Sequence, residues 1–173
     1  MNYGRYRTKT YIAADWTGDK DAVDQLYKWK SSNYWSFDFV DAHDLTQARD
    51  SSLNCSIKTS LKKRLDVSKT FVLIVGDQTK NVRAGSCQYC TSYSAWTSYC
   101  TRGHTIDHSS YIEYECRKAV EAGIKIVVLY NSIKVDKSKC PDVIRNYGKH
   151  IPMIRPQHGN YWDYQGVKDA IQN

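Results

Sequence analysis

The chain has 173 residues, enough for one domain with a full hydrophobic core that needs no metal ion or disulfide to fold. Its formal net charge is +7, but the lysines and arginines are spread along the chain and accompany no DNA- or RNA-reading motif. We therefore expect a basic surface and no nucleic-acid partner. No apolar run approaches the roughly 20 residues that span a bilayer, and the polar N-terminus is unlike a signal peptide. We expect a cytoplasmic protein with no membrane partner and mostly reduced cysteines.

Strands and helices alternate through the first half of the chain. The patterns predict a strand at residues 10–15, a helix at 19–30, a strand at 37–40 and a helix with a Leu or Ile at every fourth position from 53 to 65. The run from Lys69 to Gly76 is the clearest strand. Its unbroken apolar sequence predicts burial on both faces, as in a parallel sheet.

The second half begins with a long insert, roughly residues 77–108, that is rich in Ser, Thr, Cys and aromatic residues. Loops of this length inside a compact domain are usually functional or stabilised by a further contact. The elements expected after it are a helix from Ser110, a strand at 124–130, a short helix at 141–146, a weak strand at 151–154 and a final helix at 165–171. This alternation predicts one α/β domain over residues 1–173 with a parallel sheet of about five strands.

The segment from Ser109 to Tyr130 is the most informative part of the chain. Ser110 and Glu113 have the spacing of a capping box, which gives Glu113 a structural role first. At 100° per residue, Glu115 lies at the rim of the apolar stripe of this helix, where it is partly shielded from water. A carboxylate there is placed to face a cleft beside the sheet, although most such residues are only the edge of an amphipathic helix.

The order of these motifs resembles the TIR-like domains of bacterial antiphage systems, close to the Thoeris defence family. The similar features are a first strand that ends in a polar residue (Tyr11–Trp16), the strand Thr70–Gly76, a helix of the type Tyr-Glu-x-x-x-Ala-x-x-x-Gly-x-x-Ile from Tyr114 to Ile126, and a strand that ends at Asn131. The resemblance covers about residues 9–132. It implies a flavodoxin-like three-layer sandwich with helices on both sides of a central parallel sheet.

Members of this family cleave the nicotinamide–ribose bond of NAD. The resemblance thus implies an NAD nucleosidase or ADP-ribosyl cyclase-type enzyme, with NAD as substrate and no tightly bound cofactor. It implies a product that activates a separate effector protein, and it is compatible with a homo-oligomer. The catalytic Glu of the family maps onto Glu115 and its nucleotide pocket onto Ala14, Asp15 and Trp16, with Asp44 a weaker candidate. Whether the product is linear, cyclic or conjugated ADP-ribose stays open.

Other interpretations of these residues remain. Asp15 is equally suited to a helix cap or a loop hydrogen bond, Trp16 to a core edge, and Asn131 to a turn. The main alternative function is a non-catalytic module of the same fold that binds a nucleotide or a protein. A phosphotransfer receiver is disfavoured, because Val75-Gly76-Asp77 is followed by no matching Lys at the next strand end. The absence of Gly-x-Gly-x-x-Gly after the first strand argues against a hydride-transfer dinucleotide fold.

The insert carries a second group of chemically versatile side chains: Cys87, Cys90, Cys100, His104 and His108. Three thiols and an imidazole are zinc ligands, but the spacing lacks the paired pattern of known zinc modules. We favour reduced cysteines among aromatic side chains and assign no metal, with a redox switch through Cys87 and Cys90 as a third option. Because the insert directly precedes the helix of Glu115, we expect it to form a wall or lid over the pocket.

Overall fold

The structure is a computed structural model that describes residues 6–40, 53–157 and 159–173. Within these residues a parallel sheet of four strands forms the centre, in the order β1-β2-β5-β6. The strands are β1 (Lys9–Ala13), β2 (Ser68–Val75), β5 (Lys125–Tyr130) and β6 (Lys149–Pro152). Since all neighbouring pairs are parallel, the carboxyl ends of the strands meet at one edge of the sheet.

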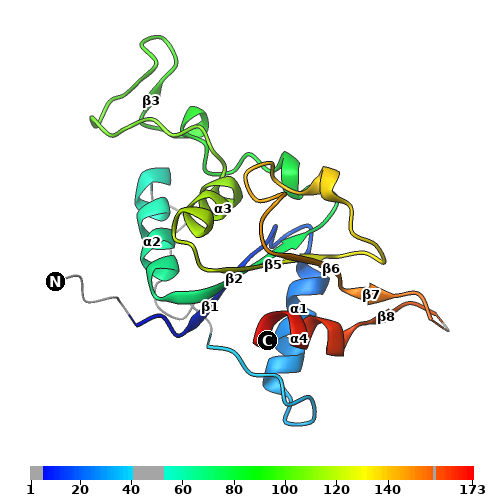
Figure 1. The fold of residues 1–173 in the computed structure, drawn as a ribbon. Coiled ribbons are helices and arrows are strands. Elements are labelled where there is room, and N and C mark those ends of the chain that lie inside the picture. Colours follow the sequence, from blue (N-terminus) through cyan, green and yellow to red (C-terminus); the bar gives the residue numbers. More distant parts are fainter. Residues whose placement is uncertain (1–5, 41–52, 158) are drawn as a thin grey trace.

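Helices cover both faces of this sheet and give the molecule three layers (Figure 1). One face is covered by α2 (Asn54–Asp66) and α3 (Tyr111–Glu121), and the other by α1 (Lys20–Ser31) and α4 (Tyr164–Gln172). This architecture confirms the flavodoxin-like α/β fold. In the described part of the chain, no helix has the length and hydrophobicity that crossing a bilayer requires.

Alternation along the strands divides the core into two halves. Tyr11 and Phe71 face α2 and α3, whereas Ile12 and Val72, the next residues along the same strands, face α1 and α4. All four side chains are fully buried. The predicted burial of β2 on both faces is therefore confirmed, and each side chain of β1 has a defined face.

The segment 37–40, expected to be a strand, does not form one. The Phe37 ring packs edge-on against Trp29, with 6.2 Å between the ring centroids. The amide of Thr10 donates a hydrogen bond to the carbonyl oxygen of Val40 at 2.6 Å, but no ladder follows within the described residues. The alternating pattern thus reflects aromatic packing on α1, and the expectation of a strand here was wrong.

The C-terminal third contains more turns than expected. Residues 141–146 form turns held by bonds such as Ile144 N to Pro141 O at 3.2 Å, because a segment this short does not repay the nucleation of an α-helix. The expected strand at 151–154 is divided in two. β6 ends at Pro152, and β7 (Ile154–Arg155) pairs antiparallel with β8 (Tyr161–Trp162).

The insert between β2 and α3 is ordered as short elements. They are two 3₁₀ turns, η2 (Thr79–Asn81) and η3 (Cys87–Tyr89), and a small hairpin of β3 (Tyr93–Ser94) with β4 (Tyr99–Cys100). A further 3₁₀ turn, η4 (Lys137–Lys139), follows β5. The hairpin projects away from the sheet beyond α2 and α3 (Figure 1). The hairpin therefore forms no lid over the sheet, and of the expected wall or lid only the first residues of the insert, Asp77 and Gln78, line a pocket.

Candidate active site

Helix α3 begins at a complete capping box, as the sequence predicts. The Ser110 hydroxyl accepts a hydrogen bond from the amide of Glu113 at 3.1 Å, and the Glu113 carboxylate accepts one from the amide of Ser110 at 2.8 Å. These two bonds satisfy amide groups that the helix itself leaves without partners. The Glu113 carboxylate is thereby engaged in holding the first turn.

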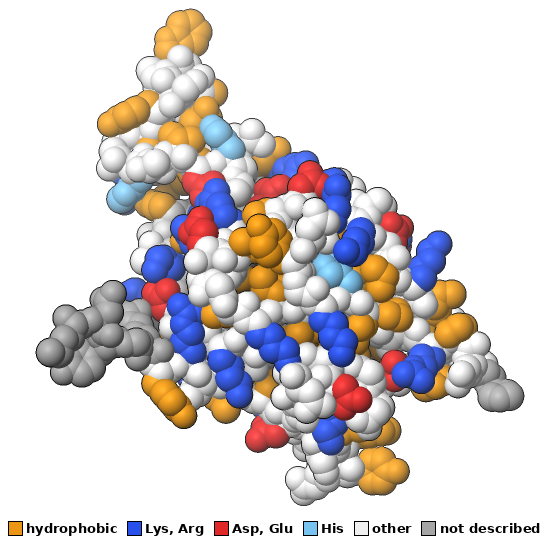
Figure 2. Space-filling view, in the orientation of Figure 1, with side chains coloured by type: hydrophobic (Ala, Val, Ile, Leu, Met, Phe, Trp, Pro, Cys, Tyr) orange, Lys and Arg blue, Asp and Glu red, His pale blue; other side chains and the backbone are white. Residues whose placement is uncertain are grey.

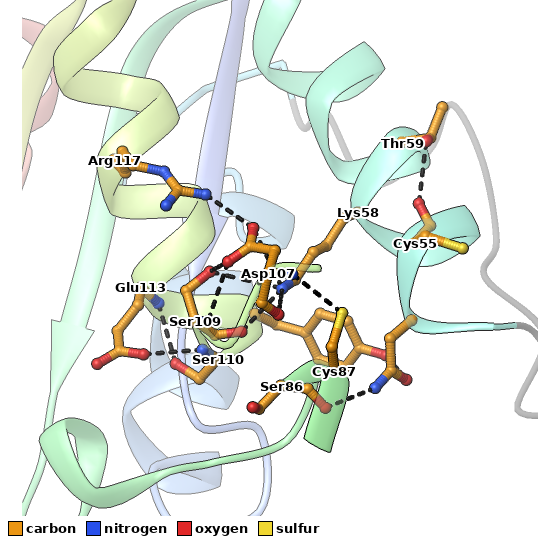
Figure 3. Close-up of polar contacts among 12 residues, drawn as sticks. Cys55, Lys58, Thr59, Ser86, Cys87, Asp107, Ser109, Ser110, Glu113 and Arg117 are labelled. Atoms are coloured by element: carbon orange, nitrogen blue, oxygen red, sulfur yellow. Dashed lines mark hydrogen bonds and ion pairs between the residues drawn. The ribbon is translucent and has the colours of Figure 1, made fainter. Parts of the chain in front are cut away.

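A second set of polar contacts ties the start of α3 to α2 (Figure 3). The Asp107 carboxylate accepts hydrogen bonds from the Ser109 hydroxyl at 2.6 Å and from Arg117 at 2.8 Å. The buried Lys58 ammonium of α2 donates to the carbonyl oxygens of Asp107 at 3.2 Å and Ser109 at 2.8 Å. Burial raises the pKa of Asp107, but these hydrogen bonds and the Lys58 charge outweigh burial and hold the pKa well below its usual range. We call these four residues the Asp107 clamp.

Glu115 lies deeper than the rim position that the helical pattern predicts. It is only 6% exposed, and its carboxylate accepts a hydrogen bond from the Tyr11 hydroxyl of β1. Arg64 of α2 hydrogen-bonds the same hydroxyl. The rim position was derived from the sequence of α3 alone. In the fold, α2 packs beside α3 and closes over its edge. Glu115 is therefore enclosed by three elements.

This enclosure changes the acidity of Glu115. Burial raises the pKa of its carboxyl group from 4.5 to about 7, although the Tyr11 hydrogen bond and the positive charge of Arg64 both favour the charged form. Protonated and charged forms are then both populated near neutral pH. Carboxyl groups adjusted in this way are enriched at functional sites.

A separate pocket of about 110 Å³ lies at the carboxyl edge of the sheet. Its lining residues are Asp15, Gly18, Asp19, Gly76, Asp77, Gln78 and Asn131, which follow β1, β2 and β5. Open parallel α/β sheets bind ligands at this edge. The pocket is smaller than the roughly 300–1,000 Å³ of a drug-sized site, so it suits one ring of a nucleotide rather than a whole dinucleotide.

Asp19 is the buried carboxylate of this carboxyl-edge pocket. Asn131 donates hydrogen bonds from its amide nitrogen to Asp19 at 3.1 Å and to Asp21 at 3.0 Å. A side chain at position 76 would overlap the Asp19 carboxylate, so only glycine fits there. Burial raises the pKa of Asp19 above its ordinary value, although the hydrogen bond from Asn131 opposes the increase. Asn131 and the glycine at position 76 thus position the Asp19 carboxylate in the pocket lining.

Comparison with known families agrees with this architecture. A model of the family described as Thoeris protein ThsB, TIR-like domain, matches residues 11–84. This match supports a Thoeris TIR-like domain in the chain. The family places the domain in antiphage defence. A comparison with curated proteins finds no match. The matched segment runs from β1 to the start of the insert and includes Tyr11, Asp15 and Arg64, whereas Glu115 lies beyond it.

In the structure, the residues that the resemblance assigned to the nucleotide pocket do not lie together. Asp15 lines the carboxyl-edge pocket and also makes a loop hydrogen bond. Ala14 is buried in the core beneath α1 and α4. Trp16 is 46% exposed, with its ring centroid 6.4 Å from that of Tyr27 on α1. Asp44 lies outside the described residues.

Glu115 does not line the carboxyl-edge pocket of the TIR-like domain. Tyr11, its hydrogen-bond partner, lies in the middle of β1 and faces α2 and α3. Asp15 instead follows the end of that strand. Of the predicted site residues, the described structure brings only Asp15 into this pocket and keeps Glu115 in the core.

Sequence reasoning missed Tyr11, Arg64 and Asp19 as site residues. The alternation of β1 offered a signal for Tyr11, since it places Tyr11 on the opposite face from Ile12. Asp19 follows a glycine shortly after the first strand, where ligand-binding loops begin. Arg64 gave no signal, because it ends a run of basic residues that resembles a solvent-exposed helix face.

The three cysteines of the insert and one cysteine of α2 line the same small cavity. Its lining includes Cys55, Cys87, Cys90, Cys100 and His104. In the part of the chain that the structure describes, however, no three His, Cys, Asp or Glu side chains are arranged to hold one metal ion. His108 instead packs edge-on against Tyr93, with 5.8 Å between the ring centroids.

Proposed function

We propose that the TIR-like domain cleaves the nicotinamide–ribose bond of NAD and that Glu115 is its catalytic carboxylate. The observation that carries the proposal is Glu115 itself, a buried carboxyl group near the start of α3 with a pKa of about 7. Tyr11 donates a hydrogen bond to it, and Arg64 adds a positive charge nearby. A stability role alone does not explain an ionisable group there, because a buried charge is destabilising unless it is fully compensated.

The chemistry requires little more than a positioned negative charge. When the ribose–nicotinamide bond breaks, its electron pair leaves with the nicotinamide, which is cationic in NAD and becomes neutral. The ribose carbon acquires oxocarbenium character, which a nearby carboxylate stabilises electrostatically. Because the leaving group needs no protonation, one Glu is sufficient. NAD is thus consumed as a substrate.

In this conformation the Glu115 carboxylate is covered, so substrate must reach it through a rearrangement. We interpret the structure as a resting state in which Tyr11 occupies the hydrogen-bonding position that a ribose hydroxyl takes during turnover. The carboxyl-edge pocket, with Asp15 and Asn131 in its lining, supplies a place for part of the nucleotide. Low activity of the isolated domain follows from this arrangement.

The signalling role belongs to the same proposal. We propose that the product is a cyclic or conjugated nucleotide derived from ADP-ribose, made in the cytoplasm, and that it activates a separate effector protein. The family match to an antiphage defence system supports this role. Which acceptor attacks the ribose carbon decides the product.

A non-catalytic nucleotide-binding module is the second candidate. The observation in its favour is that the carboxyl-edge pocket is open to ligands while Glu115 is buried in the core. Such a module would bind NAD through Asp15 and Asn131 without cleaving it.

Nicotinamide release from NAD separates the two candidates. The wild-type domain and Glu115→Ala are incubated with NAD, each with and without extract from phage-infected cells, and NAD binding is measured by calorimetry. If the domain is an enzyme, the wild type releases nicotinamide and Glu115→Ala does not. NAD binding without nicotinamide release in any condition, unchanged in Glu115→Ala, would establish the binding module instead.

A further inference from the structure

Four of the six cysteines gather at the base of the insert. Cys55 belongs to the first turn of α2, Cys87 begins the turn η3, Cys90 follows that turn, and Cys100 ends β4. All are free thiols, and all line one cavity of about 10 Å³, which is no larger than one water molecule requires. Thiols from three separate elements are thus enclosed together, in a place that NAD cleavage does not use.

We propose that Cys87 and Cys90 form a reversible disulfide and make the base of the insert a site of oxidation by peroxide. The amide of Cys90 donates a hydrogen bond to the carbonyl oxygen of Cys87 at 2.9 Å. A turn closed in this way holds its first and last Cα atoms within about 7 Å, and disulfides join Cα atoms about 4.4–6.8 Å apart. The bond therefore needs little backbone movement.

The two thiols differ in access, which suggests an order of reaction. Cys90 is half-buried, whereas Cys87 is only 9% exposed. The Cys90 thiolate attacks one oxygen of hydrogen peroxide, the O–O bond breaks, and a sulfenic acid and one water result. Cys87 then attacks the Cys90 sulfur, the S–S bond forms, and the S–O bond breaks to release a second water. Two thiols thereby lose two protons and two electrons, and one peroxide becomes two waters.

The oxidised pair is coupled to the start of α3. The Cys87 sulfur accepts a hydrogen bond from the amide of Asp107 at 3.2 Å (Figure 3). Asp107 in turn is the centre of the clamp that joins Lys58 and Arg117. A disulfide draws the Cys87 sulfur towards Cys90 and removes this bond. Oxidation should therefore speed hydrogen exchange at the Asp107 amide.

The test uses the complete chain, reduced and then exposed to hydrogen peroxide. After the remaining thiols are blocked with a maleimide, we expect two fewer blocked thiols and, before blocking, a mass lower by about 2 Da. Digestion with trypsin and chymotrypsin cuts after Tyr89, so a disulfide between Cys87 and Cys90 holds two fragments together. Dithiothreitol should separate them.

Two variants make the assignment specific. Cys90→Ser should abolish the bond, whereas Cys55→Ser, which alters another thiol of the same cavity, should leave it intact. The proposal is overturned if peroxide leaves all thiols free or joins Cys55 or Cys100 instead. Stoichiometric zinc that protects the thiols until it is chelated would overturn it as well. None of these outcomes depends on NAD cleavage.

Discussion

Glu115 is an ionisable residue in the buried core, where a charge does not stabilise the fold. Its pKa of about 7 in the folded state exceeds its ordinary value of 4.5 because burial disfavours the charge. Between these two values the folded protein binds the proton that the unfolded chain releases. This group therefore contributes fully to the free energy of unfolding below about pH 4.5. Its contribution is lost as the pH rises through 7. Retaining such a residue is a cost that a catalytic role explains.

Replacing Glu115 by Gln should consequently stabilise the domain at alkaline pH. At pH 8 we expect the Gln variant to exceed the wild type by on the order of 2–3 kcal/mol in free energy of unfolding, because no buried charge forms. At pH 4 the protonated wild-type side chain resembles Gln in both states, so the difference should nearly vanish. Urea unfolding at both pH values measures it, and a difference independent of pH would contradict the assigned acidity.

Tyr11 should tune this acidity. Its hydroxyl hydrogen bond favours the charged form of Glu115, so Tyr11→Phe should raise the Glu115 pKa further. Carboxyl-¹³C NMR titration of labelled glutamate follows the change directly. The matched control is Tyr130→Phe, which removes a hydroxyl that contacts His150 at 2.9 Å and leaves Glu115 untouched. A lowered or unchanged pKa in Tyr11→Phe would show that the hydrogen bond has no such effect.

At the scale of elements, the start of α3 determines where Glu115 lies. The capping box fixes the first turn, and the Asp107 clamp fixes that turn against α2. Glu115 follows one turn later, so small shifts of this helix end move its carboxylate relative to Tyr11. The insert reaches the helix through the same contacts and is therefore mechanically linked to the candidate catalytic residue.

Removing the helix cap should weaken the domain measurably. Ser110→Ala deletes the hydroxyl that accepts the Glu113 amide, and loss of such a cap lowers the free energy of unfolding by about 1 kcal/mol. Ser110→Thr keeps the acceptor oxygen and should retain most of the stability. Chemical denaturation of both variants tests this, and equal losses in the two would rule out the cap as the cause.

At the scale of the whole molecule, charge is divided between the two edges of the sheet. A lysine lies at the first or second position of each central strand, at Lys9, Lys69, Lys125 and Lys149. The opposite edge has a pocket lined by three carboxylates, at Asp15, Asp19 and Asp77. Figure 2 shows Lys and Arg side chains spread over much of the visible face. The net charge of +7 therefore does not describe the pocket, which is locally acidic. Its carboxylates favour a cationic nicotinamide ring over a diphosphate.

The projecting hairpin should contribute little to folding. Its tip residue Trp96 is 97% exposed, and Tyr93 and Cys100 form a cross-strand pair at its base. Replacing residues 94–99 by Asn-Gly supplies a two-residue turn between these partners. We expect the free energy of unfolding to change by less than about 1 kcal/mol. A larger loss in thermal or urea unfolding would mean that the hairpin supports the core.

The periodic segments of the fold were predictable and the contacts between them were not. The apolar run of β2 and the capping box of α3 gave correct elements because both depend on local sequence. Phe37 misled the strand prediction, since alternation of aromatic residues also arises from packing on a helix. Asp15 lies at the carboxyl edge of the sheet because it follows β1, whereas the burial of Glu115 depends on α2, which is distant in sequence.

We assign the chemistry to Glu115 and not to Glu113, which lies two residues before it. The measurement is nicotinamide release from NAD by the wild type, Glu115→Gln and Glu113→Gln, in the presence of extract from phage-infected cells. Gln at 113 can still complete a capping box, so this variant should keep near wild-type release. Glu115→Gln should lose on the order of 10²-fold or more, because the charge that stabilises the oxocarbenium is gone. Equal release by the two variants would exclude Glu115 as the catalytic carboxylate.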